Sequence, residues 1–133
     1  MDINLWAVLI SAIIYMAIGA VWYSPTMFSQ AWMKEIGKSE KELKANAKPA
    51  LYLSTFLAEL VAVYVLAWVM NQVAALNSVE GIKVAIVLWL GFAATTSLVN
   101  SGFAGRSTKL YLIDLFYHGV SLAVAGAIIG SWR

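Results

Sequence analysis

The chain has 133 residues, of which 62% are hydrophobic and 12% are charged, with a net charge of +2. Soluble domains carry about 25% charged residues, so this chain has more apolar surface than a soluble core could bury, and lipid must be part of its solvent. The small net charge gives no support to a nucleic-acid partner, and the absence of cysteine excludes disulfides, thiol nucleophiles and thiolate metal sites.

The first predicted membrane span covers residues 3–23. No lysine or arginine precedes it, and it continues into Trp22 and Tyr23, an aromatic pair suited to the membrane interface. These features favour a retained helix over a cleaved signal peptide. Helical spacing places Ser11, Tyr15 and Trp22 on one face of this span.

Residues 24–49 form the predicted connection to the second span. Pro25 is suited to the start of a new helix, and apolar residues recur with helical spacing at Phe28, Ala31, Trp32 and Ile36. This pattern predicts a short amphipathic helix lying in the interface and ending at Gly37. A capping box over residues 39–42 predicts a second short helix over residues 40–47.

Three further spans are predicted over residues 50–70, 82–99 and 110–130. Each is long and apolar enough to cross about 30 Å of hydrocarbon. The second span contains Glu59, and the fourth contains Asp114 and His118, which are four positions apart and share one helix face. We therefore predict an all-α polytopic membrane protein that forms one domain over residues 1–133, with four transmembrane helices and the interfacial helix between the first two.

The basic residues predict the orientation of this protein in the cell membrane. Seven lie in the first and third connections and two on the opposite side: Lys34, Lys38, Lys41, Lys44, Lys48, Arg106 and Lys109 against Lys83 and Arg133. Because cytoplasmic loops are enriched in lysine and arginine, both termini are expected on the non-cytoplasmic side. Besides the bilayer, a homo-oligomer is an expected partner, since a chain this small buries few residues away from lipid and has glycine and alanine in its first and fourth spans.

The candidate site is an intramembrane group of acids with a histidine, because ionisable residues are costly in a bilayer and normally face protein or water. Glu59 and His118 lie nine and eight residues into parallel spans, about 12–14 Å from the cytoplasmic end, so we predict that they face each other. Asp114 is one turn closer to that end, within reach of Arg106, Lys109 or Thr96. Supporting polar residues are expected at Tyr15, Thr96, Asn100, Tyr111, Tyr117 and Ser121, and interfacial contacts at Trp22, Tyr23, Pro25 and Trp32.

Several functions are compatible with such a group. It could carry protons or solute in a small transporter or channel-like protein, or it could only hold the helices together in a non-catalytic scaffold or accessory subunit. One histidine with Glu59 and Asp114 matches no established metal-ligand motif, so no metal and no cofactor are expected. Ser121 follows His118 by three residues, but no oxyanion donors can be named, and an enzyme is the least favoured interpretation.

Five stretches carry a resemblance to a known family: Gly19–Pro25, Phe28 with Ala31-Trp32, Trp89–Phe92, Ile113-Asp114 with Tyr117-His118, and Gly126 with Gly130 and Trp132-Arg133. The chain resembles small bacterial and archaeal membrane proteins grouped as domain of unknown function 1761. The resemblance implies a four-helix membrane protein and no established activity. Glu59 is not part of the family's pattern, which favours Asp114 and His118 as the centre of the site.

Overall fold

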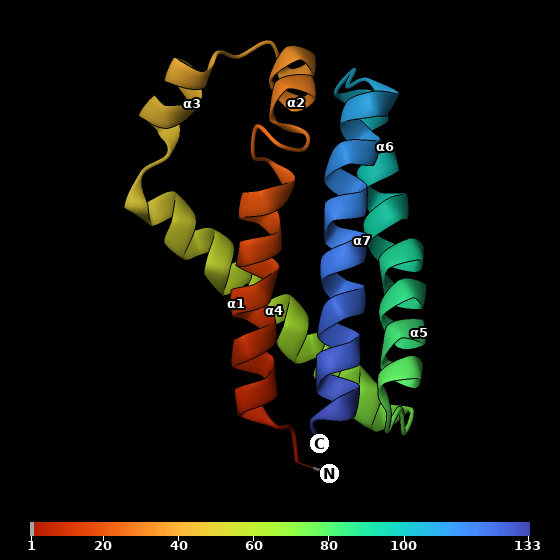
Figure 1. The fold of residues 1–133 in the computed structure, drawn as a ribbon. Coiled ribbons are helices and arrows are strands. Elements are labelled where there is room, and N and C mark those ends of the chain that lie inside the picture. The colour runs from red at the N-terminus through yellow and green to blue at the C-terminus, as the bar shows by residue number, and fades with distance from the viewer. Residues whose placement is uncertain (1) are drawn as a thin grey trace.

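The computed structural model describes residues 2–133 and is built from helices (Figure 1). In chain order these are α1 (Leu5–Trp22), α2 (Ser29–Ile36), α3 (Glu40–Asn46), α4 (Pro49–Gln72), α5 (Ser78–Leu88), a π-helix η1 (Trp89–Ala94), α6 (Thr95–Phe103) and α7 (Thr108–Ser131). Four helices are long and apolar enough to cross a membrane, with α5, η1 and α6 together making the third. The predicted fold class is therefore confirmed.

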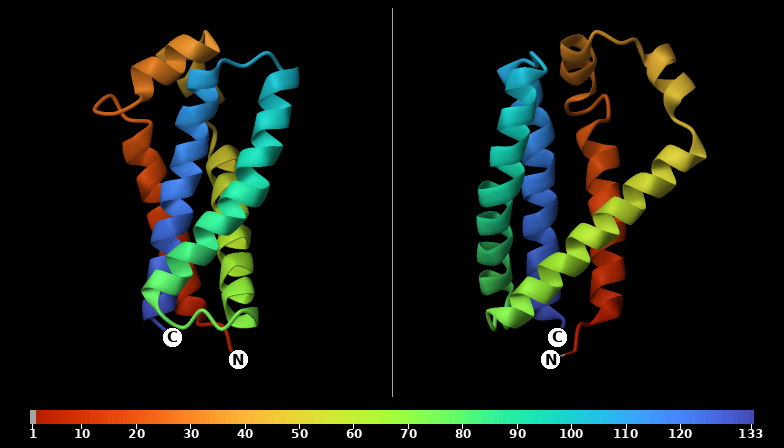
Figure 2. Two further views of the ribbon diagram at one scale, coloured as in Figure 1. Left: turned by 90° about the vertical axis from the view of Figure 1, so that its right-hand side faces the viewer. Right: turned by 180° about the vertical axis from the view of Figure 1, so that it is seen from behind.

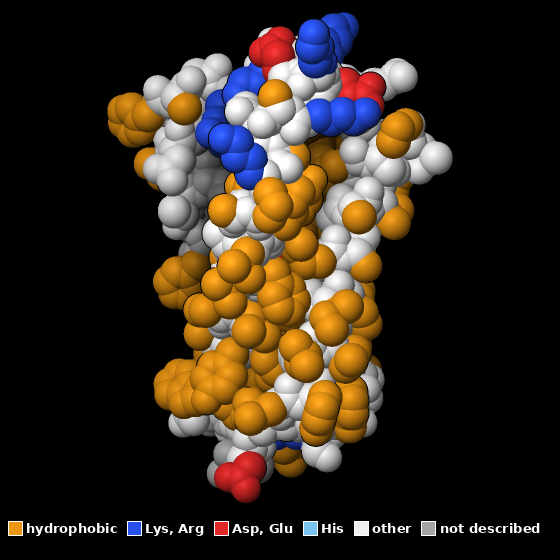
Figure 3. Space-filling view, turned by 90° about the vertical axis from the view of Figure 1, so that its left-hand side faces the viewer, with side chains coloured by type: hydrophobic (Ala, Val, Ile, Leu, Met, Phe, Trp, Pro, Cys, Tyr) orange, Lys and Arg blue, Asp and Glu red, His pale blue; other side chains and the backbone are white. Residues whose placement is uncertain are grey.

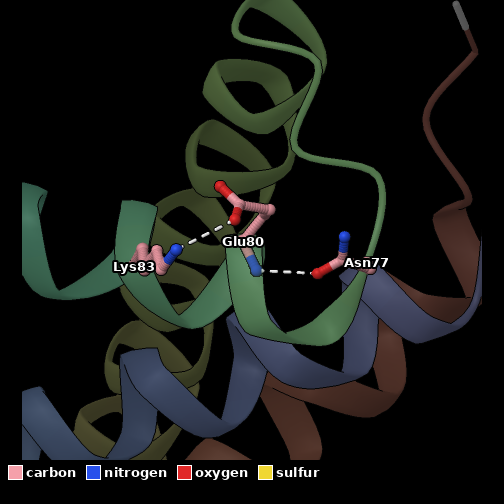
Figure 4. A network of polar contacts seen from close by, with 3 residues as sticks. All are labelled: Asn77, Glu80 and Lys83. Atoms are coloured by element: carbon pink, nitrogen blue, oxygen red, sulfur yellow. Dashed lines mark hydrogen bonds and ion pairs between the residues drawn. The ribbon is translucent and has the colours of Figure 1, made fainter.

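The predicted spans agree with these helices, with one difference. The first, second and fourth helices lie within two residues of their predicted bounds, whereas the third extends four residues further at each end. At its start, Asn77 caps α5 by accepting from the amide of Glu80, and Glu80 pairs with Lys83 at 3.0 Å (Figure 4). The first turn of this helix is therefore polar, with a cap and an ion pair, and this is why hydropathy alone predicts a later start for the span.

The two short helices have the predicted sequence signals. Gly37 ends α2 in the left-handed conformation with φ 70°, which glycine adopts without steric cost. Ser39 and Glu42 form both hydrogen bonds of the predicted capping box at the start of α3. Both helices lie at the end of the molecule away from the termini, and lysine and arginine side chains gather there above a broad apolar surface (Figure 3).

Four long helical rods run between the two ends of the molecule. Helix α7 lies between α1 on one side and the continuous α5–η1–α6 rod on the other, whereas α4 crosses the bundle at a steep tilt (Figures 1 and 2). Both termini lie at the same end, as an even number of spans requires. The core where α1, α4 and α7 meet is buried close to this end and includes Ala7, Val63, Leu66, Met70 and Ala125.

Glycine allows α5 and α7 to approach each other closely. A Cβ atom on Gly81 would lie 2.0 Å from the carbonyl oxygen of Gly126, and one on Gly126 would lie 2.3 Å from the carbonyl oxygen of Gly81. One turn further along, a Cβ on Gly130 would lie 2.2 Å from the carbonyl oxygen of Asn77. The two backbones are therefore in direct contact, as small residues permit in membrane helix pairs.

Two side-chain hydrogen bonds join the π-helix of the third span to α7, one donated by the first residue of η1 and one donated by a tyrosine of α7. The Trp89 indole donates to the carbonyl of Leu115 at 2.9 Å, and the Tyr111 hydroxyl donates to the carbonyl of Ala94 at 2.7 Å. Such wide turns accommodate one extra residue and are frequent at functional sites. Both bonds join the ends of η1 to α7, close to the polar residues described next.

Candidate functional site

His118 lies on α7 and contacts α1 through Tyr15. The Tyr15 hydroxyl and His118 Nδ1 are 2.5 Å apart, and Tyr15 is only 3% exposed. The Tyr117 ring lies against both, with ring centroids 5.4 Å from Tyr15 and 4.7 Å from His118. This aromatic group joins the polar face of α1, predicted from the spacing of Ser11, Tyr15 and Trp22, to the polar face of α7.

Glu59 on α4 is buried beside Tyr117, with 5% of its surface exposed. Its Oε1 accepts a hydrogen bond from the Tyr117 hydroxyl at 2.7 Å, and the same hydroxyl lies 3.2 Å from the carbonyl oxygen of Tyr15. Glu59 Oε2 has no hydrogen-bond partner within the described part of the chain. The structure thus brings Glu59 to the residue next to His118, and the tyrosine takes the contact that we expected the imidazole to make.

Asp114 contacts the end of α1. The Tyr23 hydroxyl donates to Asp114 Oδ1 at 2.6 Å, and its ring packs edge-on against Trp32 of α2. Tyr23 follows the last residue of the first span; burial, together with the hydrogen bond to Asp114, raises the pKa of its phenol above the ordinary value. The phenol therefore stays protonated at neutral pH and keeps its donor. The expected partners Arg106, Lys109 and Thr96 form no hydrogen bond or ion pair with Asp114 among residues 2–133.

A cavity of about 440 Å³ opens beside Asp114 and His118, and we call it the inner cavity. Its lining comes from α1, α2, α6, the following loop and α7: Tyr23, Trp32, Ser97, Ser101, Arg106, Leu110, Tyr111, Asp114, Leu115 and His118. A second hollow of about 590 Å³, the outer cavity, shares Trp32, Arg106, Leu110 and Asp114 with it. The outer cavity is also lined by Glu35 and Lys38, so it lies between the inner cavity and the helix that carries these two charged residues.

The side chain of His118 is exposed, and it is one wall of the inner cavity. From the sequence we expected the imidazole to lie within the bundle, sheltered by adjoining helices. The structure differs because the face of α7 that carries Asp114 and His118 borders the inner cavity. The exposed imidazole and the buried Glu59 are therefore in different surroundings.

The third span contributes Ser97 and Ser101 to the inner cavity, and not the expected Thr96 and Asn100, which are exposed elsewhere. Each lining residue is one position later than the expected one. Thr96 and Asn100 were expected for their polar side chains, and no periodicity in the sequence marks the π-helix that precedes α6. Sequence reasoning therefore missed both serines.

The remaining expected residues have mainly structural contacts. Tyr111 lines the inner cavity while bonding to Ala94, and the Trp22 indole donates to the carbonyl of Ile113 at 3.0 Å. Ser121 is buried, as is Ser11 on α1, and the described residues offer neither hydroxyl a partner. Pro25 lies in the turn between α1 and α2, where Ser24 bonds to Val21 and Thr26.

Within residues 2–133, no three histidine, cysteine or carboxylate side chains are grouped so that they could hold a metal ion. The candidate site is a set of proton-exchanging and charged side chains around a cavity.

Comparison with known proteins gives one match. The model of a protein family described as "Protein of unknown function (DUF1761)" matches residues 6–130, nearly the whole chain. Neither the curated proteins nor the solved structures gave a match.

Proposed function

The chain belongs to the DUF1761 family of proteins of unknown function, and from its own side chains we propose that it is a small membrane transporter that moves protons through His118. A channel-like mechanism is included in this proposal. The proton is assigned to His118 because an imidazole exchanges protons close to neutral pH, and because ionisable groups in membrane spans are usually functional.

The position of His118 between two environments is the observation that carries this proposal. One side of the residue faces the inner cavity, and Nδ1 is in contact with the Tyr15 hydroxyl. A proton arriving through the two cavities would pass Asp114, which lines both, and reach the imidazole in the inner cavity. It would then pass to groups that the cavity does not reach.

Glu59 is the next proton-exchanging group along this path. It lies beyond Tyr117, whose hydroxyl contacts both the Glu59 carboxylate and the Tyr15 carbonyl. Beyond Glu59, the bundle is closed by the apolar side chains of Val63, Leu66 and Met70. Transport across the whole bilayer therefore requires this core to open, and the steeply tilted α4 carries all three residues.

Proton movement is measured with purified protein in liposomes that enclose a pH-sensitive dye, under a potassium diffusion potential. We expect the internal pH to change faster than in protein-free vesicles, and the rate to fall to the protein-free value in His118→Ala. Tyr64→Phe is the control, since Tyr64 is an exposed residue of α4 outside the site. A wild-type rate equal to that of protein-free vesicles, under potentials of both signs, contradicts the proposal.

One observation favours a second function, that of a membrane scaffold or accessory subunit. Each carboxylate of the site accepts from a tyrosine hydroxyl outside its own helix: Tyr23, which directly follows α1, bonds to Asp114, and Tyr117 of α7 bonds to Glu59. In a scaffold these contacts would only hold α1, α4 and α7 together. Asp114→Asn and His118→Ala would then lower the melting temperature in detergent, and no version of the protein would move protons.

We also propose that the lysine-rich end of the molecule, with α2 and α3, lies in the cytoplasm. Its support is the uneven distribution of basic side chains, which gather at that end (Figure 3). The inner cavity would then be loaded from the cytoplasmic side.

A further inference from the structure

Asp114 and Arg106 line the same two cavities without pairing with each other. Both residues border the inner and the outer cavity, and the described ion pairs are Lys44 with Glu40 and Lys83 with Glu80. No described residue forms a hydrogen bond or ion pair with the Arg106 side chain. Charges of both signs are thus available to a molecule that enters.

The part of the inner cavity around Asp114 is suited to a cationic amine. Asp114 Oδ1 accepts from the Tyr23 hydroxyl, and within the described part of the chain Oδ2 has no hydrogen bond to another side chain. The rings of Tyr23, Trp32 and Tyr111 line the same cavity. A carboxylate combined with aromatic faces is the usual recognition chemistry for ammonium groups.

The part around Arg106 is suited to a carboxylate or phosphate. A guanidinium group binds both anions through parallel hydrogen bonds. The other acid of the outer cavity, Glu35, accepts a hydrogen bond from the hydroxyl of Ser107, the residue that follows Arg106, at 2.7 Å. Ser97 and Ser101 add hydroxyl groups to the lining of the inner cavity.

We propose that the inner cavity binds a small zwitterion, with its amine at Asp114 and its anionic group at Arg106. The volume of about 440 Å³ is that of a small-molecule site. This proposal deepens the proposed transport function by naming the chemical class of the solute that shares the cavity with His118. The same chemistry belongs to a free solute and to the headgroup of a zwitterionic lipid.

The test is ligand-observed NMR titration of the full chain in nanodiscs made of phosphatidylglycerol, which has no cationic group. The probes are three zwitterions of different charge separation, glycine betaine, γ-aminobutyrate and phosphoethanolamine, against butylamine and butyrate, which each carry one charge. We expect at least one zwitterion to bind at least tenfold more tightly than both singly charged compounds. Equal or weaker binding of all three zwitterions overturns the proposal.

Matched variants locate the binding. Arg106→Gln should weaken zwitterion binding at least tenfold. Lys109 is an exposed basic residue that lines neither cavity, so Lys109→Gln should change the affinity less than twofold. Asp114→Asn, which removes the charge but keeps an acceptor for the Tyr23 hydroxyl, should also weaken it at least tenfold, and Tyr23→Phe, which removes that hydrogen bond but keeps the carboxylate, should weaken it less than threefold. If Asp114→Asn does not fold, the Arg106 pair decides, and equal affinities for Arg106→Gln and Lys109→Gln overturn the site.

A further arm separates the two sources of the ligand. Replacing half of the phosphatidylglycerol by phosphatidylethanolamine should weaken probe binding at least tenfold if the cavity takes a lipid headgroup, and should leave it unchanged if the cavity takes a free solute. Both results keep the zwitterion site. Zwitterion binding without proton flux would contradict only the proposed transport function. Proton flux without zwitterion binding would contradict only the proposed zwitterion site.

Discussion

At the scale of single residues, Tyr117 connects three helices. It belongs to α7, its hydroxyl contacts Glu59 of α4 and the Tyr15 carbonyl of α1, and its ring packs against the rings of Tyr15 and Tyr23. The glutamate has no other partner among the described residues. Its burial therefore depends on one phenol hydroxyl.

Tyr117→Phe should lower the free energy of unfolding by about 1–2 kcal/mol, because the buried carboxyl loses its donor while the ring packing is kept. The measurement is reversible unfolding in detergent. Tyr64→Phe, at an exposed position of α4, is the control and should leave stability unchanged. Equal stability of the two variants would show that Glu59 does not depend on this hydroxyl.

At the scale of elements, the backbones of α5 and α7 approach each other so closely that glycine is required at the contact. Gly126→Ala should separate the two helices or distort them, because the new methyl group would lie 2.3 Å from a backbone oxygen that cannot rotate away. We expect a loss of at least about 2 kcal/mol, within the range of overpacked cores. Gly102→Ala is the matched control: it lies within α6 with open space around its Cβ position, and it should be neutral or stabilising.

The elements themselves could be predicted from the sequence, and their rotations could not. Long apolar runs, the capping box at Ser39 and the glycine at position 37 identify helices because these signals are local. Depth counting brought Glu59 close to His118, but the tilt of α4 and its rotation about its own axis decide which side chain the carboxylate meets, and this is Tyr117. The extra residue in η1 is likewise set by bonds to α7, so Ser97 and Ser101 could not be chosen over their neighbours.

At the scale of the whole molecule, the two ends differ in charge, and this difference predicts sidedness. The chain contains no cysteine, so a single introduced thiol gives an unambiguous signal. In intact cells a membrane-impermeant maleimide should label Ser131→Cys and should label Ala45→Cys only after permeabilisation, because the lysine-rich end is expected in the cytoplasm. Both substituted residues are exposed. The reverse labelling pattern would invert the proposed direction of access to the cavity.

The π-helix also gives the third span an unusual tolerance to shortening. Since η1 holds one residue more than an α-helical turn needs, deleting Gly91, which has open space around it, should let the segment relax into a regular α-helix while the serines of α6 keep facing the cavity. Deleting Leu98 from the regular helix α6 should instead turn Ser97 and Ser101 by about 100° relative to each other, so that both can no longer line the cavity. We expect the chain without Gly91 to fold and to bind the zwitterion probe in the same titration, and the chain without Leu98 to lose that binding. A family member one residue shorter at this position would then be able to keep the same site.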